Sequence, residues 1–104
     1  MAAAEVLAGI CGFKTTITAE KDDANCRLSI SSDCEHINRL AQDLTTVDPF
    51  QEISYRGDGP VTLKLAAKHC AHAACPVPAA IIKAVEVESG LALPADVTIK
   101  ISRG

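Results

Sequence analysis

The stretch from Cys11 to Cys34, CGFKTTITAEKDDANCRLSISSDC, decides the fold. Apolar and polar side chains alternate through residues 10–20, and they alternate again through residues 25–32. An alternation with period two is typical of strands that bury one face and leave the other in water. Acidic residues between the two segments favour a tight turn. We therefore predict an antiparallel β-hairpin.

The turn of this hairpin is expected within Lys21–Ala24, and the turn sets which residues face each other. In the expected register Ala19 faces Cys26, and Cys11 faces Cys34. Facing Cβ atoms in such a pair are about 4.5–5.5 Å apart. Cys26 lies at the opposite end of the hairpin, on its apolar face, and we interpret it as a core residue.

A helix is expected directly after the hairpin. Ser32 and Glu35 have the spacing of a capping box, and apolar residues follow at helical spacing. Glu35 and Arg39 can form an i,i+4 ion pair. Cys34 would be the second helical residue, where the positive end of the helix dipole favours a thiolate.

The second half of the chain carries further helix signals. Asp48-Pro49 predicts a short turn or helix within residues 46–55. Residues 61–68 alternate like a strand, but their Ala and Lys content favours a helix, which we prefer. Pro76-Val77-Pro78 opens another helix, and Gly90 ends it.

After Pro94, the residues Val97, Ile99 and Ile101 alternate with polar ones and predict a last strand. The outward faces of all three expected strands are polar, so helices should cover one face of the sheet. The predicted fold is an α+β two-layer sandwich with about three antiparallel strands and helices on one face. Residues 1–104 are expected to form a single domain, near the common domain size.

Composition narrows the classes of function. The net charge is −3, with no basic stripe and 3% aromatic residues, so nucleic acid is not expected as a partner. No apolar run approaches the roughly 18 residues of a membrane span, and the first ten residues lack the positive charge of a secretory signal. We expect a cytoplasmic protein whose thiols are reduced. An unknown protein partner is possible.

The cysteines suggest a transition-metal site. If the two helix N-termini converge, they bring the sulfurs of Cys11, Cys34 and Cys75 together. His72, Cys70 or His69 would supply a fourth ligand for zinc, and Cys70 could complete an iron–sulfur cluster. The absence of a Cys-x-x-Cys pair argues against both metals. Cys11 and Cys34 could equally be a packed thiol pair or a disulfide, and His69 and His36 could be solvated surface residues.

Two other functions stay open. Cys75 precedes a helix, so it could act as an activated thiol in an enzyme or sulfur carrier. The cysteines could also serve only to pack an interaction module. Whether the protein is an enzyme is left undecided by the sequence, although no Ser-His-Asp set or carboxylate pair accompanies the cysteines.

Two resemblances bear on these alternatives. The string Cys75-Pro76-Val77-Pro78, with the helix after it, is similar to the Cys-Pro-x-Pro helix start of small sulfur-carrier proteins. This resemblance implies that Cys75 carries a persulfide. Across nearly its whole length the chain resembles a small uncharacterised family of anaerobic bacteria and archaea. The matching motifs are Cys11-Gly12-Phe13, Ser32-Asp33-Cys34, His72 to Pro78 and Gly90 to Pro94. That resemblance implies a shared site around Cys11, Cys34 and Cys75, and an anaerobic setting favours iron–sulfur over zinc.

Overall fold

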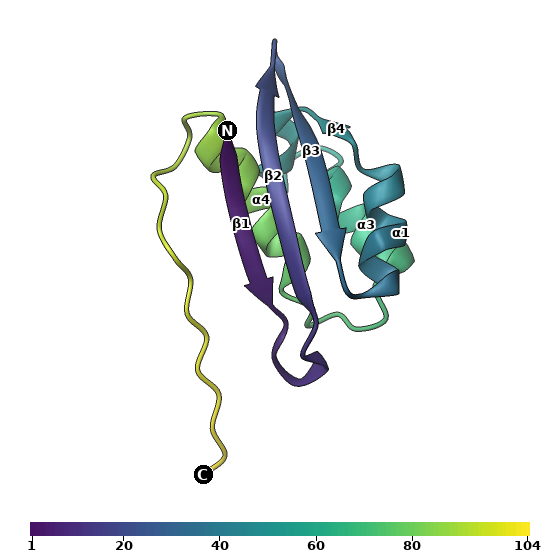
Figure 1. Cartoon of the computed structure of the whole chain (residues 1–104). Coiled ribbons are helices and arrows are strands. Elements are labelled where there is room, and N and C mark those ends of the chain that lie inside the picture. Colours follow the sequence, from purple (N-terminus) through teal and green to yellow (C-terminus); the bar gives the residue numbers. More distant parts are fainter.

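Four antiparallel strands form the sheet in the computed structural model, which describes residues 1–104 (Figure 1). Neighbours in the sheet are also neighbours in the chain, so the strands follow one another as a meander. This confirms the α+β class, with helices packed on one face of the sheet. The strands are β1 (Ala2–Leu7), β2 (Lys14–Asp22), β3 (Asn25–Ser32) and β4 (Thr46–Val47).

Helices α1, α3 and α4 lie on the same face of the sheet (Figure 1). Helix α4 contacts β1 and β2, and α1 contacts β3. No helix has the length and apolar character that a membrane crossing requires. The helices are η1 (Gly9–Cys11, 3₁₀), α1 (Glu35–Asp43), α2 (Pro49–Glu52), α3 (Val61–His69) and α4 (Val77–Glu88).

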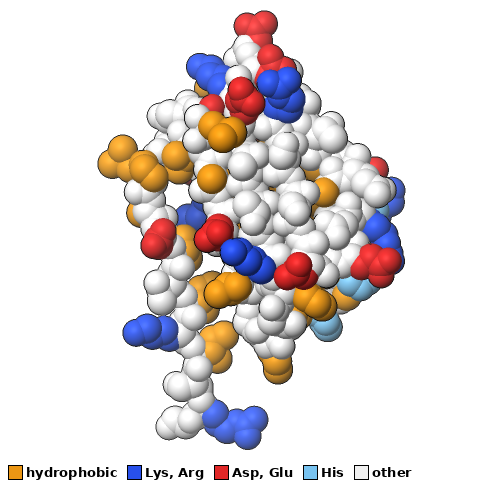
Figure 2. All heavy atoms as spheres, in the orientation of Figure 1, with side chains coloured by type: hydrophobic (Ala, Val, Ile, Leu, Met, Phe, Trp, Pro, Cys, Tyr) orange, Lys and Arg blue, Asp and Glu red, His pale blue; other side chains and the backbone are white.

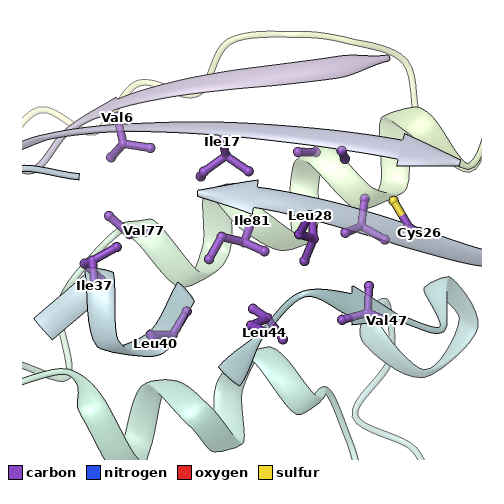
Figure 3. Close-up of a cluster of buried hydrophobic side chains, with 13 residues drawn as sticks. Val6, Ile17, Cys26, Leu28, Ile37, Leu40, Leu44, Val47, Val77 and Ile81 are labelled. Carbon is purple, nitrogen blue, oxygen red and sulfur yellow. The ribbon is translucent and has the colours of Figure 1, made fainter. Parts of the chain in front are cut away.

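The core lies between the sheet and the helices (Figure 3). Ile17 of β2 and Leu28 of β3 meet Ile81 of α4 there. At one end of the core, Ile37 from the first turn of α1 and Val77 from the first turn of α4 are both 1% exposed. Figure 3 shows the two side chains close to Val6 of β1. The first turns of α1 and α4 therefore lie at the same end of the sheet.

The helix predictions are confirmed for residues 61–68 and for the helix that Pro76 opens. The predicted ion pair between Glu35 and Arg39 is present, with an N–O distance of 3.4 Å. The start of the first helix was predicted wrongly. Cys34 is the N-cap of α1 and has an extended backbone, so it is not the second helical residue.

The hairpin forms, but its register is shifted by two residues. Ala19 pairs with Leu28, and Cys26 pairs with Lys21, because the turn contains just Asp23 and Ala24. Asp23 has a φ of 60°, which a two-residue turn with the twist of a hairpin requires. A shift by two residues keeps every side chain on its predicted face, since side chains alternate with period two.

The strands near the chain ends differ from the prediction. Residues 2–7 form a strand that the sequence did not reveal, because three alanines give little hydrophobic contrast. The last strand predicted at Val97–Ile101 is wrong as an element of this sheet. Residues 93–104 carry no regular secondary structure, and the chain there runs clear of the sheet (Figure 1). A strand exists only where a neighbour accepts and donates its backbone hydrogen bonds.

Candidate thiol site

Three cysteines come together at one end of the molecule. Cys34 is the N-cap of α1, Cys70 is the C-cap of α3, and Cys75 lies just before the N-cap of α4. Figure 1 shows the loop from β3 into α1 and the loop from α3 into α4 at the same end of the sheet. All three side chains are partly buried and pack against the hydrophobic core. The N-termini of α1 and α4 therefore lie at the same end of the sheet, whereas the sequence left their relative direction undecided.

The pKa of Cys70 reports how close these thiols are. It is raised from the ordinary value of 9.0 to about 11, and burial is the largest cause. The charge of Cys75 and a side-chain hydrogen bond with Cys75 raise this pKa further, and the charge of Cys34 adds a smaller contribution. A thiolate at Cys70 would therefore lie in the negative field of two other sulfurs.

Cys34 is held in place by hydrogen bonds around Ser32. The Ser32 hydroxyl accepts a hydrogen bond from the backbone N–H of Cys34 at 3.0 Å. Asn38, one turn into α1, donates to the Ser32 carbonyl at 2.9 Å and accepts from the Ser32 N–H at 3.2 Å. These hydrogen bonds hold the turn from β3 into α1, and they therefore hold the backbone of Cys34 in position.

The loop between α3 and α4 is held by backbone hydrogen bonds at both ends. The N–H of Cys70 donates to the Ala66 carbonyl at 2.8 Å, and the N–H of Cys75 donates to the His72 carbonyl at 3.3 Å. Pro76 then begins the turn into α4. The loop thus folds back on itself and returns the chain from Cys70 to Cys75, so that the two thiols meet.

Cys11 does not face Cys34 across the hairpin, and that prediction was wrong. Cys11 lies in η1, outside the strands, and its side chain is exposed. Figure 1 shows η1 at the same end of the sheet as the thiol loops. The structure places Cys70 close enough to Cys34 and Cys75 for their charges to raise its pKa, whereas Cys70 was predicted only as an alternative fourth ligand. The signal was available in the short spacing between Cys70 and Cys75.

The three histidines lie at different places in the fold and do not form a group. The ring of His69 lies 2.7 Å from a carboxylate oxygen of Asp43 and joins α3 to α1. His69 is therefore engaged away from the thiols, and its interpretation as a solvated residue was wrong. His72 lies in the loop between Cys70 and Cys75 and is exposed, and His36 is exposed on α1.

Cys26 is separate from the thiol site, as predicted. It is fully buried on β3, near the opposite end of the hairpin. Burial raises the pKa of its thiol, and the charge of Glu88 raises it further. Cys26 is a core residue, and its thiol stays protonated at neutral pH.

The structure contains no group of three or more Cys, His, Asp or Glu side chains arranged to hold a metal ion. The predicted metal set of Cys11, Cys34, Cys75 and His72 or Cys70 is therefore not preformed. A cluster of thiols has two kinds of chemistry: binding a soft metal, and covalent sulfur exchange. Both require thiolates.

The fold and site define a small α+β domain with a cysteine cluster at the N-terminal ends of two helices. Residues 2–101 match the model of a family of unknown function (DUF6951), and the chain belongs to that family. No curated protein and no solved structure matches the chain.

Proposed function

We propose that Cys34, Cys70 and Cys75 bind a transition metal, either a zinc ion or an iron–sulfur cluster. The observation that carries the proposal is the convergence of these three partly buried thiols, which the raised pKa of Cys70 reflects. Soft thiolate ligands select zinc, copper(I) and iron–sulfur clusters over other cations.

The electrostatics of the cluster favour a cation. Burial, and then the charges of Cys75 and Cys34, raise the pKa of Cys70 while the site contains protein alone, because like charges repel. A bound metal reverses this effect, since it attracts every sulfur and displaces the thiol protons. The N-terminal ends of α1 and α4 add a favourable field for negative sulfur at Cys34 and Cys75.

Metal binding requires the side chains to close around the ion. Zinc–sulfur bonds are about 2.3 Å long, and a structural zinc needs four ligands. Rotation about the side-chain torsions of the three cysteines, together with movement of the α3–α4 loop, would have to supply this closure. The fourth ligand would be His72 in the α3–α4 loop or Cys11 in η1, and both are exposed.

Metal content of protein purified without oxygen tests this proposal. We expect close to one equivalent of zinc or of an iron–sulfur cluster, and loss of the metal in Cys34→Ala and Cys75→Ala. Cys26→Ala is the matched control, because Cys26 lies outside the cluster and should leave the metal in place. Folded wild-type protein that stays metal-free after addition of zinc, or of iron with sulfide, would overturn the proposal.

A second function is favoured by the position of Cys75, which lies just before the N-cap of α4 and close enough to Cys70 to raise its pKa. A helix start favours negative charge, and a thiolate at Cys75 could accept sulfur from a persulfide donor. In this transfer the thiolate attacks the outer sulfur of the donor, a Cys75 persulfide forms, and the donor leaves as a thiolate. The role is that of a sulfur carrier.

Mass spectrometry separates the two functions. After incubation with a small-molecule persulfide, a carrier gains a single sulfur at Cys75, and Cys75→Ala gains none. A metal site used for structure or electron transfer predicts instead that bound metal blocks sulfur uptake. Equal labelling of Cys11 and Cys75 would contradict the carrier role, because it would show only the ordinary reactivity of accessible thiols.

A further inference from the structure

Residues 91–104, here called the C-terminal arm, do not form a strand of the sheet. It contains no helix or strand and runs as an extended segment clear of the sheet (Figure 1). Its apolar side chains are open to water: Val97 is 57% exposed, Ile99 71% and Ile101 90%. Figure 2 shows hydrophobic side chains along the arm, separate from the main body. Alternating β-branched residues of this kind favour a strand when a partner is present.

The sheet has a free edge that matches the arm. β1 pairs with β2 on one side and has no strand on its other side. Edge strands usually carry charged residues or Pro that prevent further pairing. β1 has just one charged residue, Glu5, among Ala2, Ala3, Ala4, Val6 and Leu7. Its outer backbone groups are thus available to another strand.

The two segments are complementary in pattern and charge. On β1, Ala4 and Val6 point toward the helices, while Glu5 is exposed on the opposite face. If Lys100 lies beside Glu5, then Ile99 and Ile101 lie beside Ala4 and Val6. This holds in either strand direction, because both segments alternate with period two. The apolar side chains would then extend the core face, and the charges would pair in water.

We propose that the arm adds as a strand to the free β1 edge of a second copy of this chain, and that the second copy returns its own arm. In this structure the arm forms no ladder with its own β1 and runs clear of it. The start of the arm borders α4 instead, since Leu93 and Ala95 line a small depression with Lys83 and Val87 of that helix.

Symmetry makes a second copy a suitable partner. Each copy has one unpaired arm and one unpaired β1 edge. In a two-fold symmetric dimer, each arm pairs with the β1 edge of the other copy, so no arm or edge stays unpaired. The closed exchange also removes the aggregation hazard that an uncovered edge and an apolar extended segment present together. The inference is independent of the metal proposal, because neither the arm nor β1 carries a cysteine.

The mass of the full chain in solution, measured by light scattering and sedimentation, tests this inference. We expect a dimer for the wild type and a monomer after truncation at Asp96. Ile99→Asp should weaken the dimer at least tenfold, because it places a charge on the apolar side of the arm. Thr98→Asp is the matched control, since its side chain points to the opposite face, and it should stay dimeric.

The edge itself is tested by charge reversal. Lys100→Glu should weaken the dimer about threefold, and Glu5→Lys combined with Lys100→Glu should restore it, as exposed pairs of this kind contribute modestly. A monomeric wild type at all concentrations would overturn the inference. So would a monomer whose amides at residues 97–101 are protected from hydrogen exchange, since the arm would then occupy its own edge. Equal dimerisation of Ile99→Asp and wild type would also overturn it.

Discussion

After burial, the charge of Cys75 is the largest cause that raises the pKa of Cys70, although residues 71–74 separate the two cysteines in the chain. The pair is asymmetric. Burial and the neighbouring sulfurs keep the proton on Cys70, whose pKa is raised to about 11, while Cys75 lies at the start of α4. Because the thiolate is the nucleophile and the metal ligand, the raised pKa makes Cys70 a poor nucleophile at neutral pH.

The first prediction concerns the reactivity of Cys70. With a pKa of about 11, only about one Cys70 in a thousand is a thiolate at about pH 8. Cys75→Ala removes the neighbouring charge and the hydrogen bond, so the Cys70 pKa should fall and its alkylation rate should rise several-fold. Labelling with iodoacetamide, resolved by peptide mass spectrometry across pH, measures this rate.

The control for this experiment is Cys11→Ser. Cys11 is exposed in η1 and is not among the groups that raise the pKa of Cys70. The Cys70 rate should therefore stay the same in this variant. An unchanged Cys70 rate in Cys75→Ala would show that Cys75 does not contribute to the Cys70 pKa, and that the two thiols are not coupled.

The second prediction concerns stability at alkaline pH. The pKa values of Cys26 and Cys70 are both raised above the ordinary 9.0 by folding. A group that holds its proton more tightly when the protein is folded stabilises the folded state at every pH below the pKa that the group has in the unfolded chain. This contribution is lost as the pH rises from the unfolded pKa to the folded pKa. The free energy of unfolding should therefore fall from about pH 9 toward about pH 11.

Urea unfolding at several pH values measures this loss. Cys70→Ser removes one titrating thiol, so its stability should fall less steeply above about pH 9 than that of the wild type. Cys11→Ser should keep the wild-type slope, because the exposed Cys11 side chain lies outside the cluster. Identical slopes for wild type and Cys70→Ser would contradict the prediction.

The third prediction concerns Glu52, a carboxylate that is 1% exposed. It accepts hydrogen bonds from the N–H groups of Val61 at 2.8 Å and Thr62 at 2.9 Å, and from the Thr62 hydroxyl. Glu52 thus caps α3, the helix that ends at Cys70. Glu52→Gln replaces one acceptor oxygen with a donor and leaves a buried N–H unsatisfied.

We expect Glu52→Gln to lower the free energy of unfolding by about 2 kcal/mol, as for the loss of a buried charged hydrogen bond. Urea denaturation measures the change. Glu35→Gln is a matched control, since Glu35 is 83% exposed in its pair with Arg39 and should change stability little. Equal effects of the two substitutions would mean that the Glu52 cap is not important for stability.

The sequence predicts those features that depend on residues close together in the chain, and it fails for those that depend on contacts between distant residues. The faces of β2 and β3 are predictable because Ile17 and Leu28 belong to local period-two patterns. The register is not, since shifting it by two residues preserves those faces and only the turn at Asp23 distinguishes the alternatives. Strand β1 escaped prediction because its alanines pack against α4, a contact between residues far apart in the chain.

The cysteine site likewise has features that local sequence signals predict and features that depend on the path of a loop. That Cys34 and Cys75 adjoin helix N-termini follows from local capping and proline signals. The pairing of Cys70 with Cys75 depends instead on the path of the α3–α4 loop, which the Cys75 to His72 hydrogen bond fixes. Cys11 was misplaced because its expected position depended entirely on the hairpin register.

The last prediction concerns Glu88, which joins the end of α4 to the sheet. Its carboxylate accepts a hydrogen bond from the Lys21 N–H at 2.8 Å and lies 3.2 Å from the amino group of Met1. The hydrogen bond from Lys21 is the largest cause that lowers the pKa of Glu88 below its ordinary 4.5, and the amino group of Met1 lowers it further, while burial opposes both.

A carboxylate with a lowered pKa stabilises the fold above its unfolded pKa, and this contribution is lost as pH falls through the folded pKa. Glu88→Gln should therefore be less stable than wild type at about pH 7, and the difference should shrink as pH falls below the ordinary Glu pKa of 4.5. Urea midpoints across this range measure it. Glu20→Gln, in an exposed pair with Arg27, is the control and should follow the wild-type curve. A constant difference between Glu88→Gln and wild type at every pH would show that Glu88 acts through packing and not through its charge.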